Sequence, residues 1–383
     1  MIRAEQHGLD VHPLGSGGAG GAFARFSWLW LRDHAEDDAS LDLMTMQRRV
    51  DTFNIDPSCW GSVVGHDDDG TDGFEIRWND GVTTIHSRRT LYSVAEQHLD
   101  TDWSQLQSSN PAIPGDITMW TNSSAMPPKA DLQGVVDDDN LLAEGLGQLA
   151  RYGYLVLRGN SPTRRTAEEF AARLGYVRQT IFGGIWDLAP DLSEHSDTAY
   201  SDVFLGCHTD STYSHDAPGF QFFVCLQPAV EGGESLLVDG FAIAAELAES
   251  DPSLYRDLAS IPVTGRYIEP GVHLQAERPV LRANPRGVLD QVSFNNYDRA
   301  PFLLPGDLEA RFYQAYQRFA EMAGDPARRI EVQLSQGDVL IFDNWRTLHG
   351  RNSFVGHRHY VGAYLNHEDI ESKQRTLTSV VGI

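Results

Sequence analysis

The stretch GDVLIFDNWRTLHG, residues 337–350, decides the fold because it joins a buried strand to a histidine. Four consecutive apolar residues, 339–342, indicate a strand that is covered on both faces. His349 comes shortly afterwards, and Arg358 stands nine residues further on, just before the apolar segment 360–364. The stretch therefore predicts two buried strands with a histidine and an arginine between them.

Further apolar segments precede this one, and they favour a fold built mainly from strands. Residues 220–226 and 235–238 read as strands separated by Gly232-Gly233, whereas residues 307–323 have the pattern of an amphipathic helix. This succession suits a β-sandwich or barrel core better than a parallel sheet of alternating βαβ units. We expect a mainly β fold with flanking helices.

The first part of the chain predicts a separate small β-rich domain. Residues 26–32 (FSWLWLR) read as a buried strand. Two alternating runs, 74–78 and 82–85, flank Asn79-Asp80-Gly81, which indicates a hairpin. Prolines then mark an extended linker. The expected boundaries are 1–105 for the N-terminal domain, 106–130 for the linker and 131–383 for the catalytic domain.

Composition excludes several classes of partner. The chain has 54 Asp and Glu against 30 Lys and Arg, a formal net charge of −24, and so lacks the basic surface that nucleic acids or anionic membranes require. Its three cysteines form no CxxC pair, its start lacks a signal-peptide pattern, and no apolar run is long enough to span a membrane. We expect a soluble cytoplasmic protein that binds neither nucleic acid nor membrane.

One of several His-x-Asp motifs stands out by its context. The motif occurs at 66–68, 98–100, 195–197, 208–210 and 367–369, so alone it says little in a chain with 14 histidines. Only His208-Thr209-Asp210 lies beside strongly apolar segments. Two imidazoles and one carboxylate on one face are the ligands of mononuclear iron(II) oxygenases. His208, Asp210 and His349 are therefore candidate ligands.

Arg358 adds a second indication of the same chemistry. A guanidinium at this place can hold the distal carboxylate of 2-oxoglutarate through two parallel hydrogen bonds, which lysine does less well. The alternative reading is a core histidine with satisfied hydrogen bonds and a surface arginine. That reading is the better one for any single residue, but the combined spacing and flanking strands favour the oxygenase.

These motifs resemble a known family, the iron(II)/2-oxoglutarate dioxygenases that include γ-butyrobetaine hydroxylase and trimethyllysine hydroxylase. The matching segments are DTAYSDVFLGCHTDSTY (197–213), GGESLLVDGF (232–241), FNNYDRAP (294–301), FDNWRTLHGRNSF (342–354) and HRHYVGAYL (357–365). WLRDH, at 30–34, is similar to the start of the family's N-terminal domain. The resemblance implies a double-stranded β-helix (jelly-roll) catalytic domain behind a small N-terminal domain, in a homodimer.

The resemblance also implies cofactors and their ligands. His208, Asp210 and His349 would bind Fe(II), while Arg358, assisted by Ser235, would bind 2-oxoglutarate. The implied reaction couples decarboxylation of 2-oxoglutarate by O2 to hydroxylation of an unactivated C–H bond. Relatives of the γ-butyrobetaine branch carry a cysteine-based zinc site after WLRD, but residues 34–39 here contain no cysteine. We expect an N-terminal domain without zinc.

For the substrate, the resemblance implies a small trimethylammonium zwitterion. A methylated cation is attracted to aromatic faces, and the matching cage residues are Phe182, Trp186, Tyr200 and Tyr364, with Asp197 beside them. Candidates for the anionic end are Tyr213, Asn295, Asn296 and Arg299. The alternative is that these aromatic residues only pack in the core.

Three substrates fit the sequence: 2-(trimethylammonio)ethylphosphonate, trimethyllysine and γ-butyrobetaine. The phosphonate is favoured because a guanidinium such as that of Arg299 matches its oxygens. Two other functions share part of these features, namely a non-catalytic betaine-binding protein and a methyl-lysine demethylase.

Overall fold

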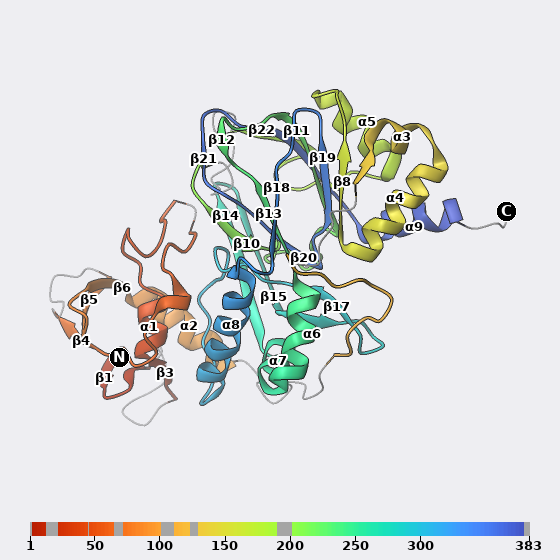
Figure 1. Cartoon of the computed structure of the whole chain (residues 1–383). Coiled ribbons are helices and arrows are strands. Elements are labelled where there is room, and N and C mark those ends of the chain that lie inside the picture. The colour runs from red at the N-terminus through yellow and green to blue at the C-terminus, as the bar shows by residue number, and fades with distance from the viewer. Residues whose placement is uncertain are drawn as a thin grey trace.

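The computed structural model describes residues 2–12, 22–44, 46–64, 72–100, 111–122, 129–189 and 201–378. The N-terminal strands and helices lie to one side of a larger body that contains the remaining elements (Figure 1). No helix in these ranges is long and apolar enough to cross a membrane.

The larger body is built on a six-stranded sheet with the order β7-β8-β19-β11-β22-β9. Its strands are β7 (Lys129–Asp131), β8 (Tyr154–Arg158), β9 (Ile185–Leu188), β11 (Phe220–Gln227), β19 (Val339–Asp343) and β22 (His359–Leu365). Along β19, Val339 and Ile341 pack beneath helices, whereas Leu340 and Phe342 point to the opposite face. Both faces of β19 are buried, which explains its continuous apolar run.

A four-stranded sheet, ordered β10-β20-β13-β18, faces the first one. Its strands are β10 (Leu205–His208), β13 (Ser235–Asp239), β18 (Arg329–Val332) and β20 (Thr347–Arg351). Leu237 and Ile330 of this sheet pack with Leu340 and Phe342 of the larger sheet in one buried cluster. The larger sheet is antiparallel except for the parallel pair β7–β8. Two facing, mainly antiparallel sheets around a shared core form a jelly roll, which confirms the predicted fold class.

Two groups of helices flank the jelly roll. The helices α3 (Leu132–Asp137), α4 (Asp139–Tyr152), α5 (Arg164–Leu174) and α9 (His367–Thr378) gather beside the larger sheet (Figure 1), where α4, α5 and α9 contribute to its outer core. The helices α6 (Gly240–Ser250), α7 (Pro252–Ser260) and α8 (Leu308–Gly324) form another core. Short pairs complete the fold: β12 (Glu231–Gly232) with β21 (Phe354–Val355), β14 (Pro262–Glu269) with β15 (Val272–Pro279), and β16 (Leu281–Ala283) with β17 (Leu289–Val292).

The N-terminal part contains two three-stranded sheets. Its elements are β1 (Ile2–Glu5), β2 (Gly8–Val11), β3 (Ala24–Ser27), α1 (Trp28–Asp33), η1 (Thr52–Asn54), β4 (Gly61–Val64), β5 (Gly73–Trp78), β6 (Thr83–Ser87) and α2 (Arg88–Asp100). β5 and β6 pair antiparallel, which confirms the hairpin predicted around Asn79-Asp80-Gly81. Leu303 of the larger body packs into the N-terminal core, so the two parts share apolar contacts.

The prediction of one strand over residues 26–32 is wrong. The strand β3 ends at Ser27, and the helix α1 begins at Trp28. The Ser27 hydroxyl accepts a hydrogen bond from the Trp30 backbone N–H at 3.0 Å, which caps the first turn of the helix. The alternating aromatic residues resembled a strand, but this cap and the burial of Trp28, Trp30 and Leu31 favour the helix.

Part of the expected linker packs on the catalytic domain. Trp120 is buried, and its indole N–H donates to the Tyr152 carbonyl at 2.7 Å. The buried Arg346 guanidinium donates to the Thr118 carbonyl at 2.8 Å and to Asp239. Residues 111–122 are thus held by the catalytic domain, whereas 106–110 and 123–128 lie outside the described residues.

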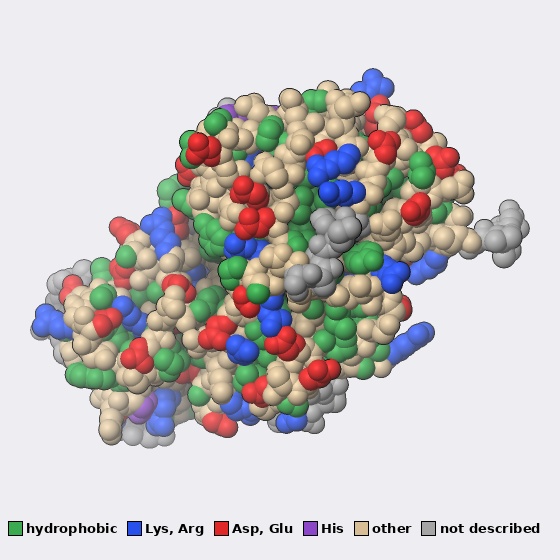
Figure 2. All heavy atoms as spheres, in the orientation of Figure 1, with side chains coloured by type: hydrophobic (Ala, Val, Ile, Leu, Met, Phe, Trp, Pro, Cys, Tyr) green, Lys and Arg blue, Asp and Glu red, His purple; other side chains and the backbone are tan. Residues whose placement is uncertain are grey.

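Acidic side chains are dispersed over the surface seen in Figure 2. On this face red Asp and Glu side chains are interspersed with blue Lys and Arg and with uncharged residues.

The buried His86 predicts that acid destabilises the N-terminal part. Burial lowers the pKa of His86 to about 3, and the Thr84 hydroxyl, which accepts from Trp78, lies 2.9 Å from its Nε2. Between that value and the ordinary pKa of about 6.5 the unfolded chain binds a proton that the folded chain does not, so stability falls as the pH falls. From pH 7.5 to 5.5 the expected contribution is about 1 kcal/mol.

Urea unfolding at both pH values tests this expectation. The His86→Asn variant should lose part of the pH dependence, whereas the variant His273→Ala, at an exposed histidine, should keep it. An unchanged pH dependence in His86→Asn would contradict the assignment.

Candidate active site

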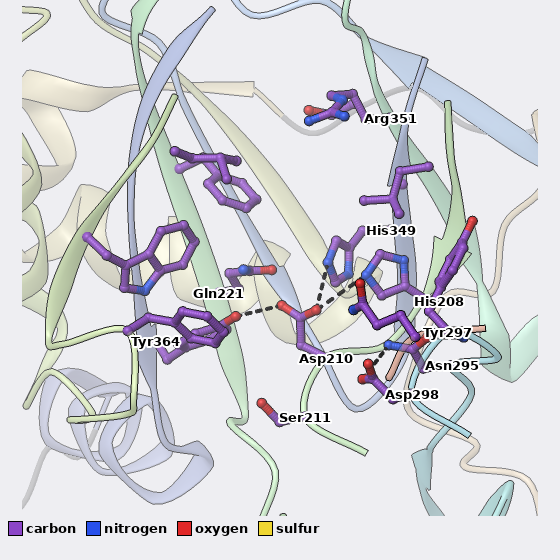
Figure 3. Close-up of a pocket in the computed structure, with 18 of the residues that line it drawn as sticks. His208, Asp210, Ser211, Gln221, Asn295, Tyr297, Asp298, His349, Arg351 and Tyr364 are labelled. Atoms are coloured by element: carbon purple, nitrogen blue, oxygen red, sulfur yellow. Dashed lines mark hydrogen bonds and ion pairs between the residues drawn. The ribbon is translucent and has the colours of Figure 1, made fainter. Parts of the chain in front are cut away.

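The structure brings the three predicted metal ligands together at one end of the jelly roll. β10 and β20 pair antiparallel with His208 opposite His349, and Asp210 stands two residues after the end of β10. Asp210 Oδ1 lies 3.3 Å from His208 Nε2 and 3.5 Å from His349 Nε2 (Figure 3). Within the described ranges these residues form the one group of His, Cys, Asp and Glu suited to a metal ion, and their ligand atoms lie within 4.8 Å of one another.

Neighbouring groups hold two of these ligands in place. His208 Nδ1 lies 2.8 Å from the Gly206 carbonyl oxygen, which directs Nε2 toward the other two ligands. The Asp210 backbone N–H donates to the Asn344 side-chain oxygen at 2.8 Å, and Ser211, next along the chain, adopts a left-handed φ of 58°. The turn after β10 thereby places the carboxylate beside both imidazoles.

The electrostatic state of the ligands suits a divalent cation. Burial raises the pKa of Asp210, but the charges and hydrogen bonds of His349 and His208 outweigh it and hold this pKa well below its usual range. Burial lowers the pKa of His349, which favours the neutral imidazole that binds metals. Burial lowers the pKa of His208, but the hydrogen bond and charge of Asp210 outweigh it and raise this pKa, so His208 would release its proton when a metal binds. Two imidazoles and one carboxylate on one face, next to a cavity, fit Fe(II) with positions left for further ligands.

Arg358 lies in the same cavity, where no carboxylate of the described residues pairs with its charge. Its side chain is buried, and its guanidinium carbon lies 3.6 Å from the centroid of the Tyr360 ring. Among the described residues no hydrogen-bond partner meets its Nε and no carboxylate forms an ion pair with it. A buried unpaired cation is costly, so the site fits an anionic ligand such as a 2-oxoglutarate carboxylate. Ser235 lines the same cavity.

Three of the four aromatic residues predicted to form the cage are among the described residues. Phe182, Trp186 and Tyr364 line the cavity, and the rings of Trp186 and Tyr364 lie 5.5 Å apart. The Tyr364 hydroxyl donates to Asp210 Oδ2 at 2.8 Å (Figure 3), so this ring lies directly beside the metal ligands. The other two predicted residues, Asp197 and Tyr200, lie outside the described residues.

Only two of the four residues predicted to bind the anionic end of the substrate line the cavity. Tyr213 and Asn295 line it, but Asn296 and Arg299 do not. The Arg299 guanidinium instead lies 2.5 Å from the buried Asp33 carboxylate, and Asn296 donates to Thr52 at 3.2 Å. The assignment of Arg299 to a substrate anion therefore needs correction, because the N-terminal domain already supplies its counter-charge.

Several cavity residues were not predicted from the sequence. They are Gln47, Leu188, Leu205, Ser211, Gln221, Phe223, Tyr297, Asp298, Gly350 and Arg351. Two of them could have been predicted from the sequence. Arg351 stands two residues after His349 and therefore lies on the same face of the strand. Gln221 is a polar residue within the apolar segment that forms β11. No sequence pattern predicts Gln47, because it belongs to the N-terminal part of the chain and not to the jelly roll.

Comparison with known proteins agrees with this geometry. Residues 116–364 match the family described as taurine catabolism dioxygenase TauD, TfdA family. The mitochondrial trimethyllysine dioxygenase of Gallus gallus is 32% identical over 92% of this chain and 83% of its own. The γ-butyrobetaine dioxygenase of Pseudomonas sp. is 28% identical over 93% and 91%. A solved structure, a putative alpha-ketoglutarate-dependent taurine dioxygenase from Burkholderia xenovorans, covers 66% of this chain and 92% of its own at 17% identity, with a TM-score of 0.46.

A jelly roll that presents two histidines and an aspartate beside a buried arginine defines an Fe(II)- and 2-oxoglutarate-dependent dioxygenase. The chain belongs to the TauD/TfdA family of these enzymes.

Proposed function

We propose that the enzyme hydroxylates an unactivated C–H bond of a small trimethylammonium zwitterion, with trimethyllysine as the preferred substrate. The observation that carries this proposal is that Phe182, Trp186 and Tyr364 line the same cavity as His208, Asp210 and His349. Aromatic faces attract a methylated cation, which has no hydrogen to donate. The relatives named above act, by their names, on trimethyllysine or γ-butyrobetaine.

The polar end of the cavity favours an amino acid over the phosphonate. Asp298 lines this end, and Asn295 donates to its Oδ2 at 2.8 Å. A carboxylate here attracts the α-ammonium group of trimethyllysine, whereas it repels a phosphonate. The phosphonate was favoured because Arg299 was expected to bind it. The Arg299 guanidinium instead donates to Asp33. Neither γ-butyrobetaine nor the phosphonate has an ammonium group at this end.

The arrangement of these groups positions the substrate across the metal site. In Figure 3 Tyr364 lies on one side of Asp210, and Asn295 and Asp298 lie on the other. In a zwitterion held at both ends, the central carbons therefore lie beside the metal ligands. This positioning is the protein's main contribution to the rate. Fe(II) with 2-oxoglutarate and O2 supplies the oxidising chemistry when bound. Residues such as Phe223 and Leu205 form apolar walls that restrict water.

A substrate panel tests the proposal. Trimethyllysine, γ-butyrobetaine and 2-(trimethylammonio)ethylphosphonate are each incubated with Fe(II), 2-oxoglutarate and O2, and succinate and product mass are measured. We expect trimethyllysine to give the highest kcat/KM and a product heavier by one oxygen atom. Binding without succinate release would indicate a betaine-binding protein instead.

Asp298→Asn should separate the candidate substrates. This change removes the charge opposite the α-ammonium group and keeps the shape, so kcat/KM for trimethyllysine should fall about 30-fold, as expected for loss of a charge-assisted hydrogen bond of about 2 kcal/mol. The kcat/KM for γ-butyrobetaine should not fall. The matched control is Asp307→Asn, at an exposed aspartate. Equal losses for both substrates would contradict the role of Asp298.

A further inference from the structure

A second, much smaller cavity lies beside the substrate cavity. Polar residues from four parts of the fold contribute to its wall: Thr212 from the turn after β10, Arg278 from β15, Arg299 from the segment before α8, and Tyr316 from α8. Asn295 lines both cavities. The small cavity is therefore enclosed by the elements that also form the polar end of the substrate cavity.

Four donor groups in this wall have no hydrogen-bond partner among the described residues. They are Arg278 Nη1, Arg299 Nη1, the Thr212 hydroxyl and the Tyr316 hydroxyl. All four side chains are more than nine-tenths buried. Burial raises the pKa of Tyr316, so its hydroxyl keeps its proton. Because buried polar groups are nearly always satisfied, four such donors around one space indicate a ligand that accepts hydrogen bonds.

Arg278 also has no carboxylate beside it to balance its charge. Burial lowers the pKa of Arg278 to about 10, so the guanidinium stays charged at pH 7. None of the carboxylates that the structure describes forms an ion pair with it. Asp216, which acts on it only from a distance, is exposed and pairs with Arg178 at 2.9 Å. A buried unpaired cation is costly, and an anion in the small cavity would remove this cost.

The size of the small cavity restricts the anion to a single atom. Its volume of about 10 Å³ is the room that one water-sized sphere needs. The wall is closely packed, since a Cβ added at Gly265, which also lines the cavity, would lie 2.8 Å from Thr212 Oγ1. Phosphate, sulfate and organic acids are too large for this space, whereas a monatomic halide fits.

A water molecule is the alternative occupant. Water could accept hydrogen bonds from the two guanidinium groups and donate to the two hydroxyls, which would satisfy the same four atoms. It brings no charge, however, and leaves the Arg278 cation unpaired. A halide accepts from all four donors and also supplies the negative charge, so the charge decides between the two.

We propose that the small cavity binds a chloride ion, which accepts hydrogen bonds from Arg278, Arg299, Thr212 and Tyr316. The ion neutralises Arg278 and connects the turn that carries the metal ligand Asp210 to β15 and α8. This site goes beyond the proposed function and does not depend on which substrate the enzyme uses.

A crystal of the enzyme soaked in sodium bromide tests the location of the ion. Bromide replaces chloride in such sites and scatters X-rays anomalously. We expect one anomalous peak within hydrogen-bond distance of Arg278 Nη1 and Thr212 Oγ1. A water molecule at this place, without an anomalous signal, would overturn the proposal.

Thermal unfolding tests the same site in solution. The melting temperature is measured in sodium gluconate, whose anion is too large for the cavity, with increasing replacement by sodium chloride at constant ionic strength. A ligand that binds only the folded chain stabilises it, so we expect a saturable rise of about 2 °C. An equal melting temperature in both salts would contradict chloride binding.

Two variants assign the chloride effect to this cavity. Arg278→Met removes the charge and should abolish the rise, whereas Arg256→Met, at an exposed arginine of α7, should keep it. Thr212→Val removes one donor and keeps the shape, so the half-saturating chloride concentration should increase about tenfold. If Arg278→Met fails to fold, Thr212→Val decides. A wild-type chloride response in Thr212→Val would overturn the proposal.

Discussion

Replacing His349 with alanine should reduce substrate-stimulated succinate formation by about a thousandfold, since metal-ion catalysis supplies several kcal/mol and each 1.36 kcal/mol is a factor of ten. The imidazole would supply one of three ligands, whose ligand atoms lie within 4.8 Å of one another. Without it, the ion keeps only one imidazole and one carboxylate, and both affinity and geometry are lost.

A spectroscopic measurement separates loss of the metal from loss of the fold. Anaerobic wild-type enzyme with Fe(II) and 2-oxoglutarate should show a weak visible charge-transfer band, and His349→Ala should not. His273→Ala, at an exposed histidine of β15, should retain both the band and the rate. An unchanged rate in His349→Ala would exclude this histidine as an iron ligand.

Replacing Arg358 with alanine should raise the KM for 2-oxoglutarate about a hundredfold. Two charge-assisted hydrogen bonds between a guanidinium and a carboxylate are worth about 3 kcal/mol together. Arg358→Lys keeps the charge but loses the planar fork, so we expect a rise of about tenfold. The KM for trimethyllysine should change much less, because the cage and polar end are formed by other residues.

Two comparisons make the Arg358 result specific. Arg256→Ala, at an exposed arginine of α7, controls for the loss of a positive charge. Arg351→Ala tests the other arginine of the cavity, whose guanidinium donates to the Ser201 and Val203 carbonyls. If the KM for 2-oxoglutarate rises in Arg351→Ala and not in Arg358→Ala, the carboxylate is held by Arg351.

The sequence predicted those parts of the fold that local pattern determines. Residues 339–342 are apolar because both faces of β19 are covered. This strand and the nearby His349 pointed to a β-sandwich or barrel with a metal site, and the family resemblance implied the jelly roll. Residues 26–32 were misread because the alternating aromatic residues have the spacing of a strand, while a single Ser27 hydrogen bond starts the helix. Such a cap depends on a single side-chain oxygen, so the periodicity of the apolar residues does not reveal it.

The polar end of the site could not be predicted, because it depends on contacts between distant segments. Arg299 was predicted to bind the anionic end of the substrate, but its guanidinium pairs with the carboxylate of Asp33, 266 positions away. Gln47 and Asp298 come from distant parts of the sequence and line the same cavity. The homodimer, the cytoplasmic location and the absence of zinc from the N-terminal domain stay predictions.

The most direct test of the central claim is the ratio of hydroxylated product to succinate in the presence of trimethyllysine and isotopically labelled O2. We predict nearly one product per succinate, with one labelled oxygen atom in the new hydroxyl group and the other in succinate. Failure of trimethyllysine, γ-butyrobetaine and the phosphonate alike to stimulate succinate formation would contradict the proposed function.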